Sequence, residues 1–185
     1  MPHVATVLGL ALAALSWLPA GARPVSAEEE RLGEFRFESI GGGEMGFRDW
    51  AGRPVLVANT ASLCAFAPQC AELQALHDEC RDRGLVVLAV PSGDFNQEYA
   101  TEAEVRGYCE LDYGLDLPMA TISHVLGEEA LPFHRWLAST QGFAPRWSFN
   151  EVLIGADGAV LGAWGSGERP NGAAVRGAVE GALGS

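Results

Sequence analysis

Residues 53–91 read RPVLVANTASLCAFAPQCAELQALHDECRDRGLVVLAVP, and this stretch decides the fold class. It begins and ends with short apolar runs rich in β-branched residues, 53–58 and 85–90, a pattern typical of strands buried on both faces. Between them, Leu73, Leu76 and Cys80 recur at helical spacing and predict a helix over 69–83, which Gly84 ends. A strand, a helix and a strand in this order predict two parallel strands joined by a helical crossover.

The segments on either side of this unit complete a single domain. The sequence predicts two hairpins, 35–47 and 151–164, and three further helices, 101–111, 131–138 and 173–183. Thr101 and Glu104 form a capping box at the start of the first of these helices, and Asp157-Gly158 suits the tight turn of the second hairpin. Because that hairpin adds antiparallel strands to a parallel pair, we expect an α/β sandwich with a mixed central sheet and an N-terminal β-hairpin.

Composition excludes two broad classes of protein. The chain has 185 residues and a formal net charge of -12, and all 12 of its basic residues are arginine. This acidity argues against a nucleic-acid partner, because phosphate binding needs a basic patch. A hydrophobic share of 48% and a mean hydropathy of +0.09 argue against a disordered chain.

The N-terminal residues have the pattern of a secretory signal peptide. Val4 to Leu18 is an apolar run, shorter than the roughly 20 residues that a membrane span needs. A small-x-small site, Val25-Ser26-Ala27, follows just before an acidic stretch. We therefore expect cleavage after Ala27, a mature domain over 28–185 and a periplasmic or secreted location, with no membrane span after cleavage. The alternative is an uncleaved N-terminal anchor.

An exported chain can hold disulfides, so the four cysteines bear on function. Cys64, Cys70, Cys80 and Cys109 form no C-x-x-C pair, and their spacing and the scattered histidines fit no metal site. Cys64 follows the first predicted strand and precedes a helix. Backbone N–H groups and the helix dipole at such a place favour the thiolate, which is the form that peroxides oxidise. A buried structural cysteine is the alternative interpretation.

Residues 54–70, PVLVANTASLCAFAPQC, resemble the reactive segment of glutathione peroxidase-type thiol peroxidases, whose pattern is V-N-x-A-S-x-C-G-x-T. The resemblance continues through 85–94, 107–118, 131–137 and 146–149 and covers nearly all of the expected mature chain in order. It implies a thioredoxin-like sandwich. It also implies a thiol-dependent peroxidase that reduces hydrogen peroxide or organic hydroperoxides and serves in the response to oxidative stress.

The resemblance assigns roles to individual residues. Cys64 matches the peroxidatic position, which becomes a sulfenic acid, and Trp147 matches a tryptophan that donates its indole N–H to the sulfur. Cys109 matches the resolving cysteine, with Cys70 as an alternative. A thioredoxin-like dithiol protein or glutathione would then reduce the disulfide. The resemblance further implies a monomer, and no cofactor is expected.

Several positions depart from the family pattern. Asp94 stands where a neutral amide is usual, Ser148 replaces an asparagine, and Glu151 replaces a lysine. Negative charge at Asp94 and Glu151 would raise the pKa of a nearby thiol, so we expect a slower peroxidase than members with the full set of donors. The alternatives are a thiol–disulfide oxidoreductase of the same fold and a family member that has lost catalysis.

Overall fold

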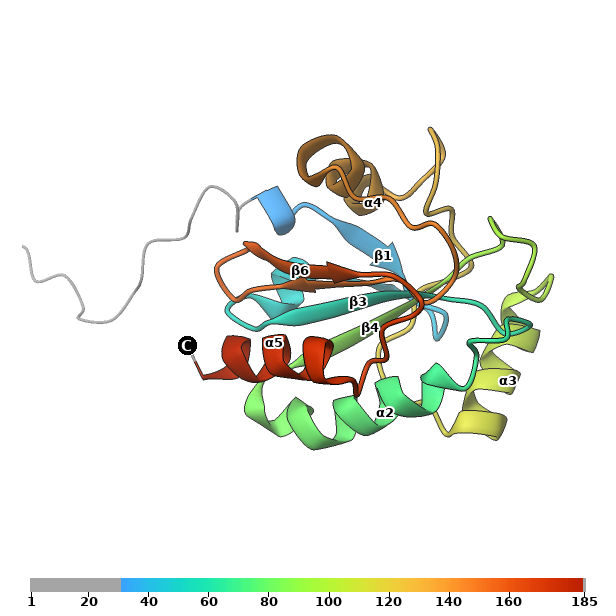
Figure 1. Ribbon diagram of the computed structural model, residues 1–185. Coiled ribbons are helices and arrows are strands. Elements are labelled where there is room, and N and C mark those ends of the chain that lie inside the picture. Colours follow the sequence, from blue (N-terminus) through green and yellow to red (C-terminus); the bar gives the residue numbers. More distant parts are fainter. Residues whose placement is uncertain (1–30, 185) are drawn as a thin grey trace, which may run out of the picture.

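A computed structural model describes residues 31–184 and confirms the predicted α/β class (Figure 1). Its central sheet has the strand order β4-β3-β5-β6. Strand β3 (Val55–Thr60) pairs in parallel with β4 (Val86–Pro91), and helix α2 (Gln69–Cys80) with the 3-10 turn η2 (Arg81–Arg83) makes the crossover. All twelve residues of these two strands are buried, as expected for strands covered on both faces. The predicted signal peptide lies outside the described residues.

The remaining strands make the sheet mixed. Strand β5 (Glu151–Ile154) runs antiparallel to β3, and β6 (Val160–Trp164) runs antiparallel to β5. A separate two-stranded sheet of β1 (Arg36–Glu38) and β2 (Glu44–Gly46) forms the predicted N-terminal hairpin, followed by the 3-10 turn η1 (Phe47–Trp50). Both predicted hairpins are therefore present.

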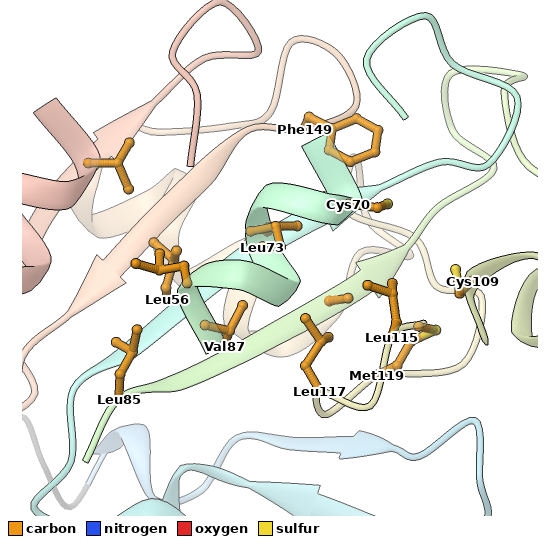
Figure 2. Packing of buried hydrophobic residues seen from close by; sticks show 14 of the residues in the cluster. Leu56, Cys70, Leu73, Leu85, Val87, Cys109, Leu115, Leu117, Met119 and Phe149 are labelled. Carbon is orange, nitrogen blue, oxygen red and sulfur yellow. The ribbon is translucent and has the colours of Figure 1, made fainter. Parts of the chain in front are cut away.

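Helices cover both faces of the sheet. Helices α2 and α5 (Ala173–Leu183) lie on one face, with α3 (Glu102–Tyr113) beside α2, and α4 (Pro132–Trp136) lies on the other face with β1 (Figure 1). Alternate strand residues enter two separate cores, so Leu56 and Val87 pack under α2 whereas Val57 and Leu88 pack under α4. Figure 2 shows the first of these cores. Within the described residues, no helix is both long and apolar enough to cross a bilayer.

Two helix boundaries differ from those expected. Helix α3 continues to Tyr113, because Gly114 supplies the left-handed C-cap (φ 62°) that the sequence reading did not use. The predicted helix over 131–138 is divided into α4 and a following π turn, η3 (Leu137–Gln141). Neither change moves the segment that contains Cys64.

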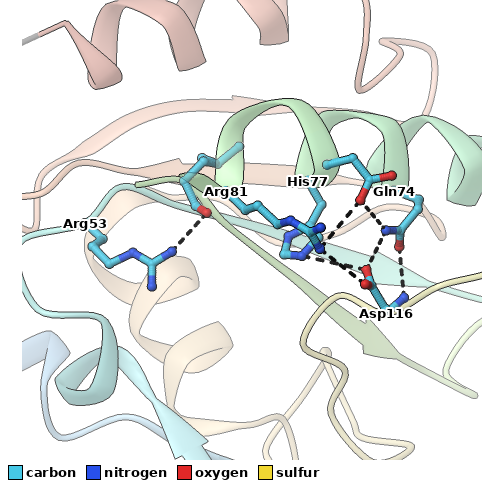
Figure 3. Close-up of polar contacts among 7 residues, drawn as sticks. Arg53, Gln74, His77, Arg81 and Asp116 are labelled. Atoms are coloured by element: carbon cyan, nitrogen blue, oxygen red, sulfur yellow. Dashed lines mark hydrogen bonds and ion pairs between the residues drawn. The ribbon is translucent and has the colours of Figure 1, made fainter. Parts of the chain in front are cut away.

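A polar network fixes the second half of α2 (Figure 3). Gln74 and Asp116 exchange two hydrogen bonds, Nε2 to Oδ1 at 2.6 Å and Asp116 N–H to Oε1 at 3.0 Å. The guanidinium of Arg81 contacts the other carboxylate oxygen of Asp116 at 3.2 Å, and burial lowers the pKa of nearby His77. The first turn of α2 has no side-chain cap, but Gln69 Nε2 donates to the carbonyl of Ser166 at 2.9 Å and Arg169 Nε donates to Glu72 Oε1 at 2.7 Å. Side-chain contacts therefore anchor the helix at both ends.

Candidate active site

Cys64 lies just past the carboxyl end of β3, in a run of tight turns that leads into α2. Cys64 is 6% exposed, and its Sγ accepts a hydrogen bond from the backbone N–H of Phe66 at 3.5 Å. Its carbonyl accepts the N–H of Ala67 at 2.9 Å, which closes the turn around the side chain. An N–H group directed at sulfur stabilises the anionic form, so this placement suits a reactive thiolate.

Trp147 packs against a neighbouring aromatic side chain, with the two rings tilted by 44° to each other. Its ring centroid lies 5.5 Å from that of Phe95, and the residue is 41% exposed. Within residues 31–184, its indole N–H makes no hydrogen bond with Cys64 Sγ. The donation to sulfur that the resemblance implies is therefore not formed in this structure and stays a prediction.

Asn59 fixes the loop that carries Trp147, a role that the sequence reading missed. Its side-chain Nδ2 donates to the carbonyl of Trp147 at 3.0 Å, and its Oδ1 accepts the N–H of Asn150 at 3.0 Å. Between these contacts Phe149 has a φ of 62°, a left-handed conformation that is unusual for an aromatic residue. Asn59 is the asparagine of the V-N-x-A-S motif, so that motif contained the available signal.

Asp94 is turned toward the segment 124–126. Its Oδ1 lies 2.6 Å from His124 Nδ1, and its Oδ2 accepts the backbone N–H groups of Val125 and Leu126 at 2.7 and 3.0 Å. Burial by itself raises the pKa of Asp94, but these hydrogen bonds outweigh it and the pKa is lowered. Bonding to Asp94 also raises the pKa of His124. Asp94 is therefore ionised, as expected, and its hydrogen bonds fix the loop 124–126.

Ser148 and Glu151 are both buried. The hydroxyl of Ser148 has no hydrogen-bond partner among the described residues, and neither do the two carboxyl oxygens of Glu151. Burial, and after it the charges of Glu72 and Glu168, raise the pKa of Glu151 to about 8. At pH 7 this carboxyl is therefore mostly neutral. The prediction of a negative charge at Glu151 is therefore wrong. The physical reason is burial of the side chain on the face of the sheet under α2, which the sequence alone does not show.

A second residue that the sequence reading missed holds the loop on the other side of Cys64. Glu98 Oε1 accepts the backbone N–H of Ser62 at 3.0 Å and that of Tyr99 at 2.9 Å. The carbonyl of Gln97 accepts the N–H of Leu63 at 2.8 Å. Burial raises the pKa of Glu98 despite these bonds. The contacts join residues 62–63 to residues 97–99, and nothing in the local sequence indicated them.

The four cysteines, Cys64, Cys70, Cys80 and Cys109, are all buried free thiols in one core. Figure 2 shows Cys70 and Cys109 in this core. Cys70 lies in the first turn of α2, and Cys109 lies in α3. Burial raises the pKa of Cys70, and burial followed by the charge of Glu98 raises that of Cys109 to about 12. Both candidate resolving thiols are therefore protonated in the reduced protein.

No group of three or more His, Cys, Asp or Glu side chains within residues 31–184 could hold a metal ion.

The family model described as glutathione peroxidase matches residues 32–138. This chain belongs to the glutathione peroxidase family. It is 38% identical over 133 residues to the glutathione peroxidase homolog BsaA of Halalkalibacterium halodurans, covering 69% of this chain and 85% of that protein. It is 33% identical over 148 residues to the hydroperoxy fatty acid reductase gpx1 of Synechocystis, covering 74% and 88%.

Solved structures confirm the thioredoxin-like sandwich. The crystal structure of Trgpx in its apo form superposes with a TM-score of 0.65 at 25% identity, covering 83% of this chain and 96% of that one. Family membership and fold therefore agree with the order of elements derived from the sequence.

Proposed function

We propose that the protein is a thiol-dependent peroxidase of the glutathione peroxidase family and that Cys64 is its peroxidatic residue. The observation that carries the proposal is the position of Cys64 Sγ, at the carboxyl end of β3 and in contact with the N–H of Phe66. The thiolate attacks one oxygen of the peroxide. A sulfur–oxygen bond forms, the oxygen–oxygen bond breaks, and the departing oxygen takes a proton to leave as water or an alcohol.

Cys109 then resolves the sulfenic acid. Its thiol condenses with Cys64–SOH, releasing water and forming a disulfide that a dithiol protein or glutathione reduces. Because the pKa of Cys109 is about 12, this step requires the thiol to lose its proton. Cys70 is the alternative resolving residue, since it shares the core with both cysteines and lies at the uncapped end of α2.

The donor set around Cys64 is reduced in this chain. Asp94 is bonded to 124–126, and the indole of Trp147 lies against Phe95. We therefore propose a peroxidase that is slower than relatives with the full set of amide donors, in which Trp147 reaches the sulfur only when the loops move.

A peroxide-consumption assay tests the proposal, run in parallel with thioredoxin and with glutathione as reductant. Cys64→Ser should abolish turnover, whereas Cys80→Ser, at a cysteine that the proposal does not use, is the matched control. Equal rates for the parent and Cys64→Ser would refute the proposal. A dimedone-type trap for sulfenic acid, read by mass spectrometry, should label Cys64 after one equivalent of peroxide.

The resolving cysteine is identified by the same measurements. Cys109→Ser should accumulate sulfinic Cys64 during turnover, a gain of two oxygen atoms, because nothing condenses with the sulfenic acid. Unchanged recycling in Cys109→Ser, together with over-oxidation in Cys70→Ser, would assign the role to Cys70.

We further propose that the protein acts as a monomer outside the cytoplasm, after cleavage following Ala27. The N-terminal sequence pattern supports export and cleavage, and the resemblance to the family supports the monomer. The intact mass of the exported protein tests it: a chain that begins at Glu28 is expected, and an exported chain that retains Met1 would refute cleavage.

A further inference from the structure

The carboxyl group of Glu98 has one oxygen engaged by the loop that carries Cys64 and one oxygen without a partner. Oε1 accepts the backbone N–H groups of Ser62 and Tyr99, at 3.0 and 2.9 Å. Oε2 is buried and makes no hydrogen bond within the described part of the chain. The hydroxyl of Ser62 is near enough to lower the pKa of Glu98, but it does not meet the geometry of a hydrogen bond. A buried carboxyl oxygen without a donor is costly, so its presence requires an explanation.

Residues 98–99 also adjoin the helix that carries Cys109. The ring of Tyr99 packs edge-on against that of Tyr108, with the ring centroids 5.7 Å apart, and Tyr108 precedes Cys109 in α3. Both tyrosine rings pack against the core that contains the Cys109 thiol. Glu98 therefore lies between the segment of the peroxidatic cysteine and the segment of the resolving cysteine.

Among the charges that act on the thiol of Cys109, that of Glu98 has the largest effect. It raises the pKa of Cys109 more than the charge of Glu110 does, although Glu110 is the next residue on the same helix. It also raises the pKa of Cys70 on α2, and Glu102 on α3 in turn raises the pKa of Glu98. Because the effect of a charge weakens with distance, the carboxyl of Glu98 lies close to the Cys109 sulfur.

The resolving step needs a proton acceptor at this place. A thiolate, not a thiol, attacks sulfur, and with a pKa of about 12 only about one Cys109 in 100,000 is a thiolate at pH 7. A carboxylate beside the thiol can remove the proton as the sulfur attacks. The pair of Glu98 and Cys109 carries one negative charge before this transfer and one after it, so the repulsion that keeps the resting thiol protonated does not oppose the transfer.

We propose that Glu98 is the proton acceptor for Cys109 in the resolving step. This inference rests on the proposed peroxidase function. The proton of the Cys109 thiol passes to Oε2 of Glu98 as the sulfur attacks Cys64–SOH. The sulfur–sulfur bond forms, the sulfur–oxygen bond breaks, and the departing hydroxide takes the proton from Glu98 to leave as water. Glu98 returns to its ionised form, and no further reactant is consumed.

Glu98→Gln tests the proposal in a single turnover. Glutamine keeps an oxygen that accepts the N–H groups of Ser62 and Tyr99, but it does not take up a proton. Reduced protein is mixed with one equivalent of hydrogen peroxide, quenched with acid at intervals, and analysed by mass spectrometry for sulfenic acid and for the disulfide of Cys64 with Cys109. At pH 7 the rate of disulfide formation should fall about a hundredfold, whereas the rate of sulfenic acid formation should change by less than about twofold.

The pH dependence of disulfide formation separates a proton acceptor from a residue that only holds the loop. In the parent the rate should rise as Glu98 ionises, with a midpoint above the ordinary value of 4.5, and then become level. In Glu98→Gln the rate should rise about tenfold per pH unit up to about pH 9, because hydroxide then removes the proton. Glu102→Gln is the matched control, since it neutralises a carboxyl that faces Glu98 and keeps an acceptor for the N–H of Ile122. It should show the level profile of the parent.

The outcomes separate this inference from the function on which it rests. Disulfide formation in Glu98→Gln at the rate of the parent refutes the proposal, and so does a slower rate with a level profile, because Glu98 would then only hold the loop. If Glu98→Gln does not fold, the parent decides the question: a rate that rises about tenfold per unit between about pH 6 and pH 9 refutes the proposal. A parent that forms no sulfenic acid at Cys64 refutes the proposed function, and the inference with it. Level profiles in the parent and Glu102→Gln, with a steep profile in Glu98→Gln, support the proposal.

Discussion

Replacing Glu151 by glutamine tests the electrostatic description of this protein directly. The carboxyl of Glu151 is 1% exposed, and its pKa in the folded protein is about 8 against an ordinary value of 4.5. Between these two pH values the folded protein holds a proton that the unfolded chain releases. The free energy of unfolding therefore falls as the pH rises from about 4.5 to about 8.

The size of the effect follows from these two pKa values. By the linkage relation, the shifted pKa of Glu151 lowers the free energy of unfolding by about 1.4 kcal/mol at pH 5.5 and by about 4 kcal/mol at pH 8. The difference between the two pH values is about 3 kcal/mol. Glutamine has a similar shape and does not titrate, and any cost of burying its amide is the same at both pH values. Glu151→Gln should therefore gain about 3 kcal/mol in stability relative to the parent between pH 5.5 and pH 8.

Urea denaturation followed by tryptophan fluorescence, at both pH values, measures this difference. Glu110→Gln is a suitable control, because Glu110 is an exposed carboxylate on α3 that bonds to Arg106. Its stability relative to the parent should change little between the two pH values. A difference between Glu151→Gln and the parent that is equal at pH 5.5 and pH 8 would show that Glu151 is ionised in the folded protein, and the description of a neutral carboxyl would be refuted.

Three further predictions concern other buried or capping groups. Thr101→Ala removes the hydroxyl that caps α3 in its box with Glu104, and urea denaturation should show a loss of about 1 kcal/mol. Asp94→Ala leaves the N–H groups of 125–126 without their acceptor and should lower the free energy of unfolding by about 2 kcal/mol at pH 7, measured by urea denaturation. Because the pKa of Asp94 is lowered in the folded protein, the difference between the variant and the parent should shrink in acid, where the parent's carboxylate is protonated. Burial lowers the pKa of His134 to about 4, so the parent should lose up to about 3 kcal/mol between pH 6.5 and pH 4, and His134→Gln should flatten this part of the stability curve.

The central unit was predictable because its signals are local. β-branched runs, a helical stripe and Gly84 fix β3, α2 and β4 with no knowledge of distant residues. The extension of α2 by a 3-10 turn was not predicted, since the pattern of apolar residues does not distinguish the two kinds of helix. The position of Cys64, between a strand and a helix, followed from the same local pattern.

The surroundings of Cys64 were less predictable, because they depend on pairs of residues far apart in the chain. The sequence marked Asp94 as a departure from the family pattern but did not indicate its partner His124, which lies thirty residues away and is brought to it only by folding. The sequence predicted a negative charge at Glu151, whereas the side chain is protonated because it lies on a buried face of the sheet. Asn59 donates a hydrogen bond to the carbonyl of Trp147, and Glu98 accepts one from the N–H of Ser62. A single sequence does not show such contacts between distant loops.

The anchoring of α2 at both ends has a consequence for hydrogen exchange. Asp116 bonds to Gln74 and Arg81 in the second half of the helix, and Gln69 and Glu72 in its first turn bond to Ser166 and Arg169. Opening of one end alone is therefore opposed by side-chain contacts, and the helix should open as one unit. Amides of residues 73–76 and 77–80 should exchange with similar free energies of opening, so freeing Cys70 during a redox cycle requires the contacts to residues 166–169 to break.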